Sequence, residues 1–303
     1  MFPPGGYVGG MRIPLVLAFV LVVGGCGGGS AEPVPSTSAP ETTASPGDDL
    51  PRDESGRISF NRVWDPGAEF VGVDLSNADF RRAQMPRVSF VETNMDGADL
   101  RRVLFSGATF LDVSLDRAKL KDASLPNSTM NRVSLQSAQL EITSFSDAAL
   151  ADVSFAHATM VLSQFADTSM SSVDFSAAVI SDTSFTSVTS NADGPVRFDG
   201  ANITGGGFVD ALLPQSSFRG ATLQSVVMIG ADLSRADFSG AVLEAVSFGD
   251  ANLEGALFEG ATVSDDLVFG ETIDAGTICP DGSDSVDNGG TCFGHGIPEP
   301  SSN

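Results

Sequence analysis

Few side chains in this sequence could support catalysis. There are two histidines, His157 and His295, and three cysteines, Cys26, Cys279 and Cys292, in 303 residues. A serine or cysteine nucleophile needs a base within hydrogen-bonding reach, and neither histidine has a serine or aspartate partner at catalytic spacing. His157 is expected to be solvated, and His295 lies alone near the C-terminus. We therefore expect that the chain is not an enzyme and uses no cofactor.

The carboxylates closest to a metal-binding pattern lie near the C-terminus. The segment "DGSDSVDNGG", residues 281–290, contains Asp281, Asp284 and Asp287. Calcium prefers carboxylate oxygens, but the spacing and the closing glutamate of an EF-hand are missing. These residue types favour turn formation, with calcium binding as the alternative. No metal site is assigned.

The first cysteine follows a segment typical of an export signal. Arg12 precedes the apolar run "IPLVLAFVLVV", which is too short to span a bilayer but fits a signal peptide. The next residues, "GGC", complete the stretch "VGGC", which resembles the lipobox of bacterial lipoproteins. The resemblance implies that residues 1–25 are removed and that Cys26 is the lipid attachment site on the extracytoplasmic side of the cell membrane. Met1 and Met11 are both candidates for the initiator.

Residues 26–57 have the composition of a linker. They include "GGGSAEPVPSTSAPETTASPGDD", a mixture of Pro, Ser, Thr and Gly without hydrophobic periodicity. A disordered chain of this length has a root-mean-square reach on the order of 30 Å. We expect this segment to tether a folded body to the lipid anchor.

The other two cysteines are expected to form a disulfide. Cys279 and Cys292 flank a Gly- and Asp-rich loop, and disulfides persist in exported proteins. The alternative is a pair of reduced surface cysteines.

The central part of the chain has a five-residue hydrophobic pattern. Every fifth residue is apolar from Phe70 to Phe185, which makes 24 positions, and again from Phe198 to Val263, which makes 14. Through the first run, the residue two places before each of these centres is Ala, Val, Ser or Thr. Residues five apart do not lie on one face of a helix or of a straight strand, so neither structure could bury all of these centres. The pattern instead favours a chain that turns a corner every five residues, with each centre pointing to a common axis.

Four corners would close a square and add a period of twenty. One column of small residues at this period contains alanine throughout: Ala78, Ala98, Ala118, Ala138, Ala158 and Ala178, and then Ala201, Ala221, Ala241 and Ala261. The step from Ala178 to Ala201 is 23 residues, which predicts a three-residue bulge near residues 188–197 within one continuous solenoid.

The stretch "ADLSRADFSGAVLEAVSFGDANLEGALFEGATV", residues 231–263, resembles the pentapeptide-repeat family, whose motif is A(D/N)Lxx. The resemblance implies an all-β fold, a right-handed quadrilateral parallel β-helix of about 9 to 10 coils. We place this solenoid at residues 58–266 and a C-terminal cap with the disulfide loop at residues 267–303. Phe60 and Trp64 are candidates for covering the N-terminal end.

Charge is distributed unevenly along the chain. The net charge is −23, which argues against nucleic-acid partners, but residues 57–132 carry 11 basic and 10 acidic groups, whereas residues 133–303 carry 3 and 23. A candidate basic contact stripe repeats at twenty residues: Arg81, Arg82, Arg101, Arg102 and Lys121. It could meet anionic headgroups or wall polymers. The alternative is a solvated stripe neutralised by carboxylates, for which the candidates are Asp112, Asp116 and Asp122.

Two functions are compatible with these features. Some pentapeptide-repeat proteins are acidic rods that imitate DNA and bind DNA gyrase, which gives fluoroquinolone resistance. An exported, lipid-anchored chain would not meet a cytoplasmic topoisomerase. We therefore expect an extracytoplasmic membrane-tethered scaffold whose partner is an envelope protein or a wall polymer, with the DNA mimic as the alternative.

Overall fold

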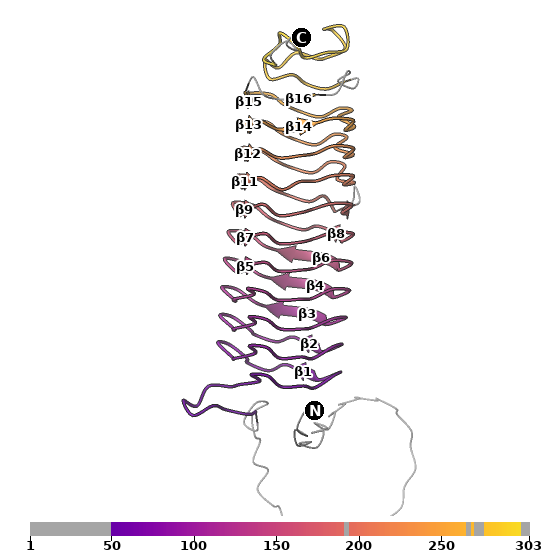
Figure 1. Ribbon diagram of the computed structural model, residues 1–303. Helices are drawn as coiled ribbons and strands as arrows, with labels where there is room; N and C mark the ends of the chain where they lie inside the picture. The colour runs from indigo at the N-terminus through magenta and orange to yellow at the C-terminus, as the bar shows by residue number, and fades with distance from the viewer. Residues whose placement is uncertain (1–49, 191–193, 265–267, 270–275, 298–303) are drawn as a thin grey trace, which may run out of the picture. The chain divides into compact units, whose positions relative to one another are not determined.

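The computed structural model describes residues 50–190, 194–264, 268–269 and 276–297, all of which belong to the compact unit Pro46–Asn303. Short β-strands and turns wind into about 10 stacked turns of chain (Figure 1). The predicted all-β parallel solenoid is therefore confirmed. No helix within the described ranges has the length and apolar character needed to traverse a bilayer.

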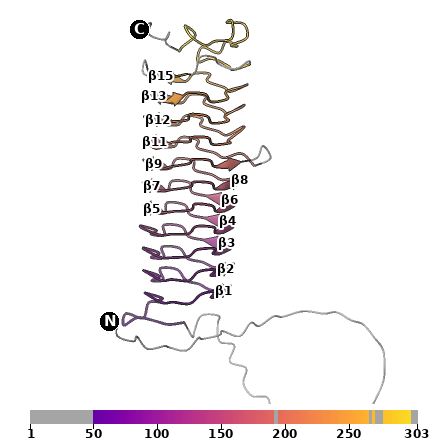
Figure 2. The same cartoon turned by 45° about the vertical axis from the view of Figure 1, so that its right-hand side comes forward.

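The strands form columns, because each turn of chain pairs in parallel with its neighbours (Figure 2). One sheet has seven strands, in the order β1 (Glu69–Val71), β2 (Ser89–Val91), β3 (Thr109–Ser114), β4 (Thr129–Ser134), β6 (Ala149–Ser154), β8 (Ser169–Ser171) and β10 (Thr189–Ser190). The second sheet has β5 (Gln139–Glu141), β7 (Thr159–Val161), β9 (Val179–Ser181), β11 (Asn202–Thr204), β12 (Thr222–Gln224), β13 (Val242–Glu244) and β15 (Thr262–Val263). A third holds β14 (Ser247–Phe248) and β16 (Val268–Phe269).

The register between neighbouring turns is twenty residues, as the alanine column predicts. Phe70 pairs with Phe90, and Phe90 pairs with Phe110. The other sides of the coil pair through single bridges with the same step, such as Asp79 with Asp99. Equivalent positions on successive turns therefore lie about 4.8 Å apart, the spacing of hydrogen-bonded strands.

The register changes once. Ile180 on β9 pairs with Ile203 on β11, a step of 23, and the bridge from Asp174 to Arg197 has the same step. The twenty-residue step resumes between Arg197 and Ser217. The three additional residues therefore fall between Ser190 and Gly194, and the parallel pairing continues on both sides of them.

Each corner uses the residue types of the repeat motif. At Leu75 the carbonyl accepts a hydrogen bond from the N–H of Ala78 at 3.0 Å, and Asn77 has a φ of 55°. A four-residue turn with positive φ only at its third residue is type II. The Asp74 carboxylate accepts a hydrogen bond from the N–H of Ser76 at 3.0 Å. The Asp or Asn of the motif thus satisfies an N–H that faces away from the parallel ladder.

Proline can follow a centre for the same reason. Pro86 and Pro126 occupy this position, and each still accepts a ladder hydrogen bond through its carbonyl, from Gly67 and Gly107, both at 2.9 Å. The missing N–H is therefore one that the ladder does not use.

The core is a stack of inward-facing centres. Phe185 is fully buried, and its ring stacks on Phe165 at 5.0 Å and on Phe208 at 4.7 Å. It also meets Phe175 and Phe198 edge to face at 5.4 and 5.6 Å. The alanine column is buried beside these rings from Ala78 to Ala241, since the narrow interior leaves little space for a second large side chain.

The two ends of the solenoid differ. Phe60 is buried and stacks on Phe80 at 4.8 Å, whereas Trp64 is 65% exposed and does not cover the core. At the other end, parallel pairing continues beyond Val263, because Leu257 bridges to Ile278.

A disulfide begins at the residue after Ile278. Cys279 and Cys292 are bonded and fully buried, with their Cα atoms 5.3 Å apart. Cys292, together with Ile297, packs in a small apolar cluster that closes this end of the described chain.

We expect Phe185→Ala to lower the free energy of unfolding by about 3–5 kcal/mol, because the ring is fully buried and little around it can collapse. Urea unfolding followed by circular dichroism measures the change. Val286→Ala, at an exposed position in the C-terminal loop, is the control and should change stability by less than about 0.5 kcal/mol. An unaltered midpoint for Phe185→Ala would contradict the stacked core.

A second prediction concerns backbone strain at Ile142, whose φ is 55° and whose side chain is 49% exposed. The left-handed region costs an L-residue about 1–2 kcal/mol, and asparagine tolerates it better. We expect Ile142→Asn to raise the free energy of unfolding by about 1 kcal/mol. Val71→Asn, at an exposed strand position without positive φ, should be neutral or destabilising. Equal stabilisation by both would contradict this explanation.

Candidate anion-binding site

The predicted basic stripe forms one surface feature. Its five residues line a shallow depression of about 500 Å³ across four successive turns. The full lining, which we call the basic depression, consists of Asn61, Arg62, Arg81, Arg82, Arg101, Arg102, Lys121 and Asp122. Sequence reasoning missed Asn61 and Arg62, although both lie one twenty-residue step before stripe residues. The structure thus adds a fifth arginine to the site.

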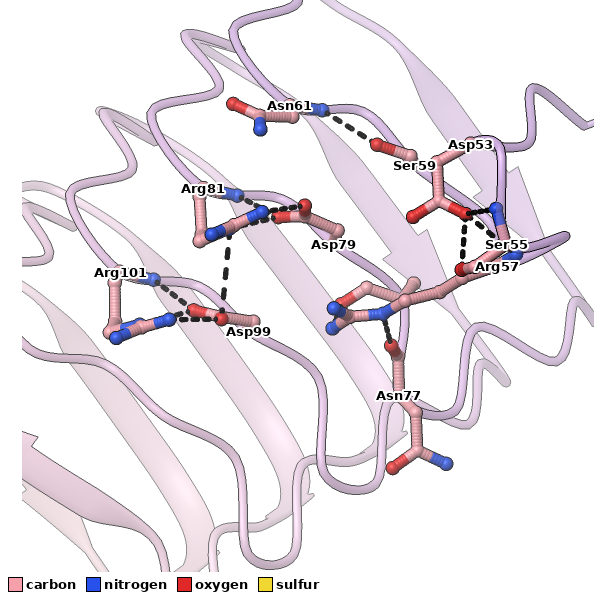
Figure 3. A network of polar contacts seen from close by, with 11 residues as sticks. Asp53, Ser55, Arg57, Ser59, Asn61, Asn77, Asp79, Arg81, Asp99 and Arg101 are labelled. Atoms are coloured by element: carbon pink, nitrogen blue, oxygen red, sulfur yellow. Dashed lines mark hydrogen bonds and ion pairs between the residues drawn. The ribbon is translucent and has the colours of Figure 1, made fainter.

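Two arginines are held by buried carboxylates on the same turn. The Nε and Nη2 groups of Arg81 donate to the two oxygens of Asp79 at 2.9 and 2.6 Å (Figure 3). Arg101 and Asp99 repeat this arrangement at 2.8 and 2.7 Å. Asp79 and Asp99 are only 2% and 5% exposed. The fork-to-fork pairing therefore fixes the direction of both guanidinium groups.

The surroundings of Asp79 and Asp99 shift the pKa values of both carboxyl groups. The hydrogen bonds from the Arg81 side chain lower the pKa of Asp79 below its ordinary value, against the opposing effect of burial. At Asp99, burial is the largest single influence and acts to raise the pKa, but the hydrogen bonds from Arg101 and the charges of Arg101 and Arg81 act against it, and the net effect is a lowered pKa. Both groups are therefore ionised at neutral pH, and Arg81 and Arg101 keep their counter-ions beneath the surface.

Pairing is incomplete among the other cations of the depression. Arg102 contacts Asp122 at 3.3 Å, and Lys121 contacts Glu141 on the next turn at 2.5 Å. Within the described part of the chain, Arg62 and Arg82 have no ion-pair partner. Six cationic side chains therefore face four carboxylates.

Only one of the three carboxylates expected to neutralise the stripe does so. Of the three candidates, Asp122 pairs with the stripe, but Asp112 binds Arg132 at 2.5 and 2.7 Å, and Asp116 accepts a hydrogen bond from the N–H of Gln136 at 2.9 Å. These carboxylates lie on other columns of the solenoid. Proximity in sequence does not predict these ion pairs, because the partners lie either two residues apart on the same turn or twenty residues apart on the next turn.

The C-terminal loop uses its carboxylates in turns. Asp281 accepts hydrogen bonds from the N–H and hydroxyl of Ser283 at 2.9 and 2.6 Å and contacts His295 at 2.9 Å, which lowers its pKa to about 2, with the Ser283 hydroxyl as the largest cause. Asp284 accepts from the N–H of Val286 at 2.8 Å. In the ranges that the structure describes, no group of three or more His, Cys, Asp or Glu side chains is arranged to hold a metal. The geometry supports turn formation.

The remaining candidate residues have structural surroundings or lie outside the described ranges. His157 is exposed at a corner with a φ of 59°. Several buried hydroxyls in the coil walls donate to backbone carbonyls, as Thr143 does to Leu120 and Ser163 does to Leu140, both at 2.8 Å. The lipid attachment predicted at Cys26 falls outside the described residues.

The fold and the residue pattern together define a class, the parallel β-solenoids with five residues on each side. Comparison with protein families agrees: a "pentapeptide repeat region" matches residues 67–140, and "pentapeptide repeats (8 copies)" match residues 197–244 and 236–265. The chain is a pentapeptide-repeat protein.

Comparison with solved structures also found similar chains. HetL, a pentapeptide-repeat protein involved in heterocyst differentiation regulation from the cyanobacterium Nostoc sp. strain PCC 7120, is 19% identical, with 76% of this chain and 94% of HetL covered and a TM-score of 0.44. Full-length QnrB1, a plasmid-mediated fluoroquinolone resistance protein, is 17% identical, with 66% and 93% covered and a TM-score of 0.36. A search of curated protein sequences found no significant match.

The Asp79–Arg81 pair predicts a pH dependence. Because the folded-state pKa of Asp79 is lowered, its contribution to stability is complete above the ordinary value of 3.8 and is lost as the pH falls through the folded value. We expect Asp79→Asn to lower the free energy of unfolding by about 1–3 kcal/mol at pH 7 and to flatten its decline below pH 4. Urea unfolding at several pH values measures both effects.

The control is Glu69→Gln, since Glu69 is exposed and has no ion pair in the described residues. Its stability at pH 7 should remain within about 0.5 kcal/mol of the unmodified protein. The same acid slope for Asp79→Asn and the unmodified protein would contradict the assignment.

Proposed function

We propose that this protein is a lipid-anchored scaffold on the extracytoplasmic face of the cell membrane, which presents a solenoid to an envelope protein or wall polymer. The observation that carries the proposal is the buried disulfide between Cys279 and Cys292. Disulfides persist in oxidising compartments and are rare in the cytosol. The bond is therefore consistent with export, which the N-terminal sequence independently predicts.

The N-terminal sequence suggests how the body is held. The lipobox-like "VGGC" ends at Cys26, and the compact unit begins at Pro46. The linker leaves the solenoid free to meet partners near the membrane.

The surface of the solenoid suits binding more than catalysis. A shallow groove of about 340 Å³ crosses four strands, β4, β6, β8 and β10. Its outward residues are small or polar, among them Thr129, Ala149, Ser169 and Thr189. Such a regular, open face offers contacts along several turns but does not enclose a small substrate. A polymer or protein surface fits this shape.

One observation favours a second candidate function. The 23 acidic and 3 basic residues of positions 133–303 give these turns a strongly negative surface, which could occupy a DNA-binding protein in place of DNA. This function requires a cytoplasmic location. The location of the protein in the cell therefore distinguishes the two candidate functions.

We expect the full-length protein to fractionate with membranes, and we expect Cys26→Ser to abolish lipid attachment and to leave the chain as the unprocessed precursor. In its cell of origin, globomycin should cause the unprocessed precursor to accumulate, since it blocks lipoprotein signal peptidase. The matched control is Ser30→Ala, four residues further along the same segment, which should be processed and keep its lipid like the unmodified protein. Recovery of the unmodified protein in the soluble cytoplasm would overturn the scaffold proposal and favour the DNA mimic.

A further inference from the structure

We propose that the basic depression binds the phosphate headgroups of an anionic lipid bilayer. The choice of a bilayer as the source of phosphate rests on the proposed membrane tether. The geometry of the depression points to an anion by itself, through its charge, its ordered guanidinium groups and its position on the chain.

The first argument is charge segregation. All six cations of the depression lie between Arg62 and Lys121, on the turns that follow the linker, and the turns beyond carry the acidic excess. An anionic surface therefore attracts the first turns and repels the later ones. A chain anchored through Cys26 would present these first turns to the membrane, because the anchor precedes them.

The column of residues that lines the depression ends at Lys121 and Asp122. Directly above Lys121 and Asp122, one turn further along, lie Glu141 and Ile142. The basic residues thus occupy four turns, about 14 Å along the axis at the spacing of paired strands. The depression is a bounded patch on the solenoid surface.

Preorganisation is the second argument. Arg81 and Arg101 use Nε and Nη2 to bind Asp79 and Asp99. The Nη1 group of each arginine makes no hydrogen bond within the described residues, so it can donate to a ligand without breaking the pair. Two ordered donors one turn apart match the several acceptor oxygens of a phosphate group.

The third argument is uncompensated charge. Arg62 and Arg82 occupy equivalent positions one turn apart and lack an ion pair among the described residues. Asp79 and Asp99, the counter-ions of their neighbours, are buried beneath the surface and cannot turn outward. A ligand approaching the depression therefore meets guanidinium groups first, and only Asp122 of the lining is acidic.

The test uses the chain from residue 26 onward with Cys26→Ser, which contains the whole compact unit Pro46–Asn303 but carries no lipid. Its binding to phosphatidylglycerol–phosphatidylcholine vesicles and to pure phosphatidylcholine vesicles is measured by co-sedimentation. We expect binding only to the anionic vesicles. The double variant Arg62→Gln/Arg82→Gln should bind on the order of 20-fold more weakly, since each basic residue contributes about one factor of five near an anionic surface.

The matched control is Arg87→Gln/Arg235→Gln. These two arginines have φ values of 60° and 58°, against 60° for both Arg62 and Arg82, and have no ion pair in the described residues, but they lie outside the depression. This variant loses the same net charge and should retain vesicle binding within about threefold, because removing charge far from the surface changes attraction only weakly. Equal weakening of the two double variants would overturn a local site.

Other outcomes distinguish the possible ligands. Equal binding to both vesicle types would overturn the headgroup proposal. Binding to soluble poly(glycerol phosphate) without binding to vesicles would also overturn it, in favour of a wall polymer. Because the tested chain lacks the lipid, an absence of vesicle binding would not contradict membrane fractionation of the full-length protein. Likewise, a cytoplasmic location of the full-length protein would not contradict the measured anion binding.

Discussion

The structure depends on one constraint: every turn of chain must present its hydrogen-bonding edge and its inward side chain in register with the turn below. The parallel ladder sets the twenty-residue step, and stacked centres such as Phe165, Phe185 and Phe208 lock it. A slip of one residue would move each centre out of the interior. The step of 23 between Ile180 and Ile203 changes this register once, and the twenty-residue step resumes after it.

The same constraint organises the surface. Residues twenty apart become neighbours, whereas residues four apart can face different sides of the coil. Asp112 therefore pairs with Arg132, and Lys121 with Glu141. Charges separated by one turn interact, so a change in composition along the chain becomes a change in surface potential along the axis. The basic depression and the acidic turns beyond it are the result.

A surface built in this way favours extended contacts. Its side chains form ladders of equivalent groups, and both the basic depression and the groove across β4, β6, β8 and β10 are shallow. Where Arg81 and Arg101 are anchored by buried aspartates, such a ladder becomes a site with defined geometry. This arrangement fits a protein that binds surfaces or polymers, which is the function we propose.

The solenoid follows from the amino-acid sequence alone, because apolar centres at every fifth position from Phe70 to Phe185 and an alanine at every twentieth can be buried only by a chain with four corners. It also predicted the stripe and the disulfide. Which groups pair depends on the folded chain, which places Asp79 and Asp99 beneath Arg81 and Arg101. The fold also adds Arg62 to the depression and leaves Trp64 exposed. A period specifies which residues stack, whereas side-chain direction within a corner depends on local hydrogen bonds, such as the one that the Asp74 carboxylate accepts from the N–H of Ser76.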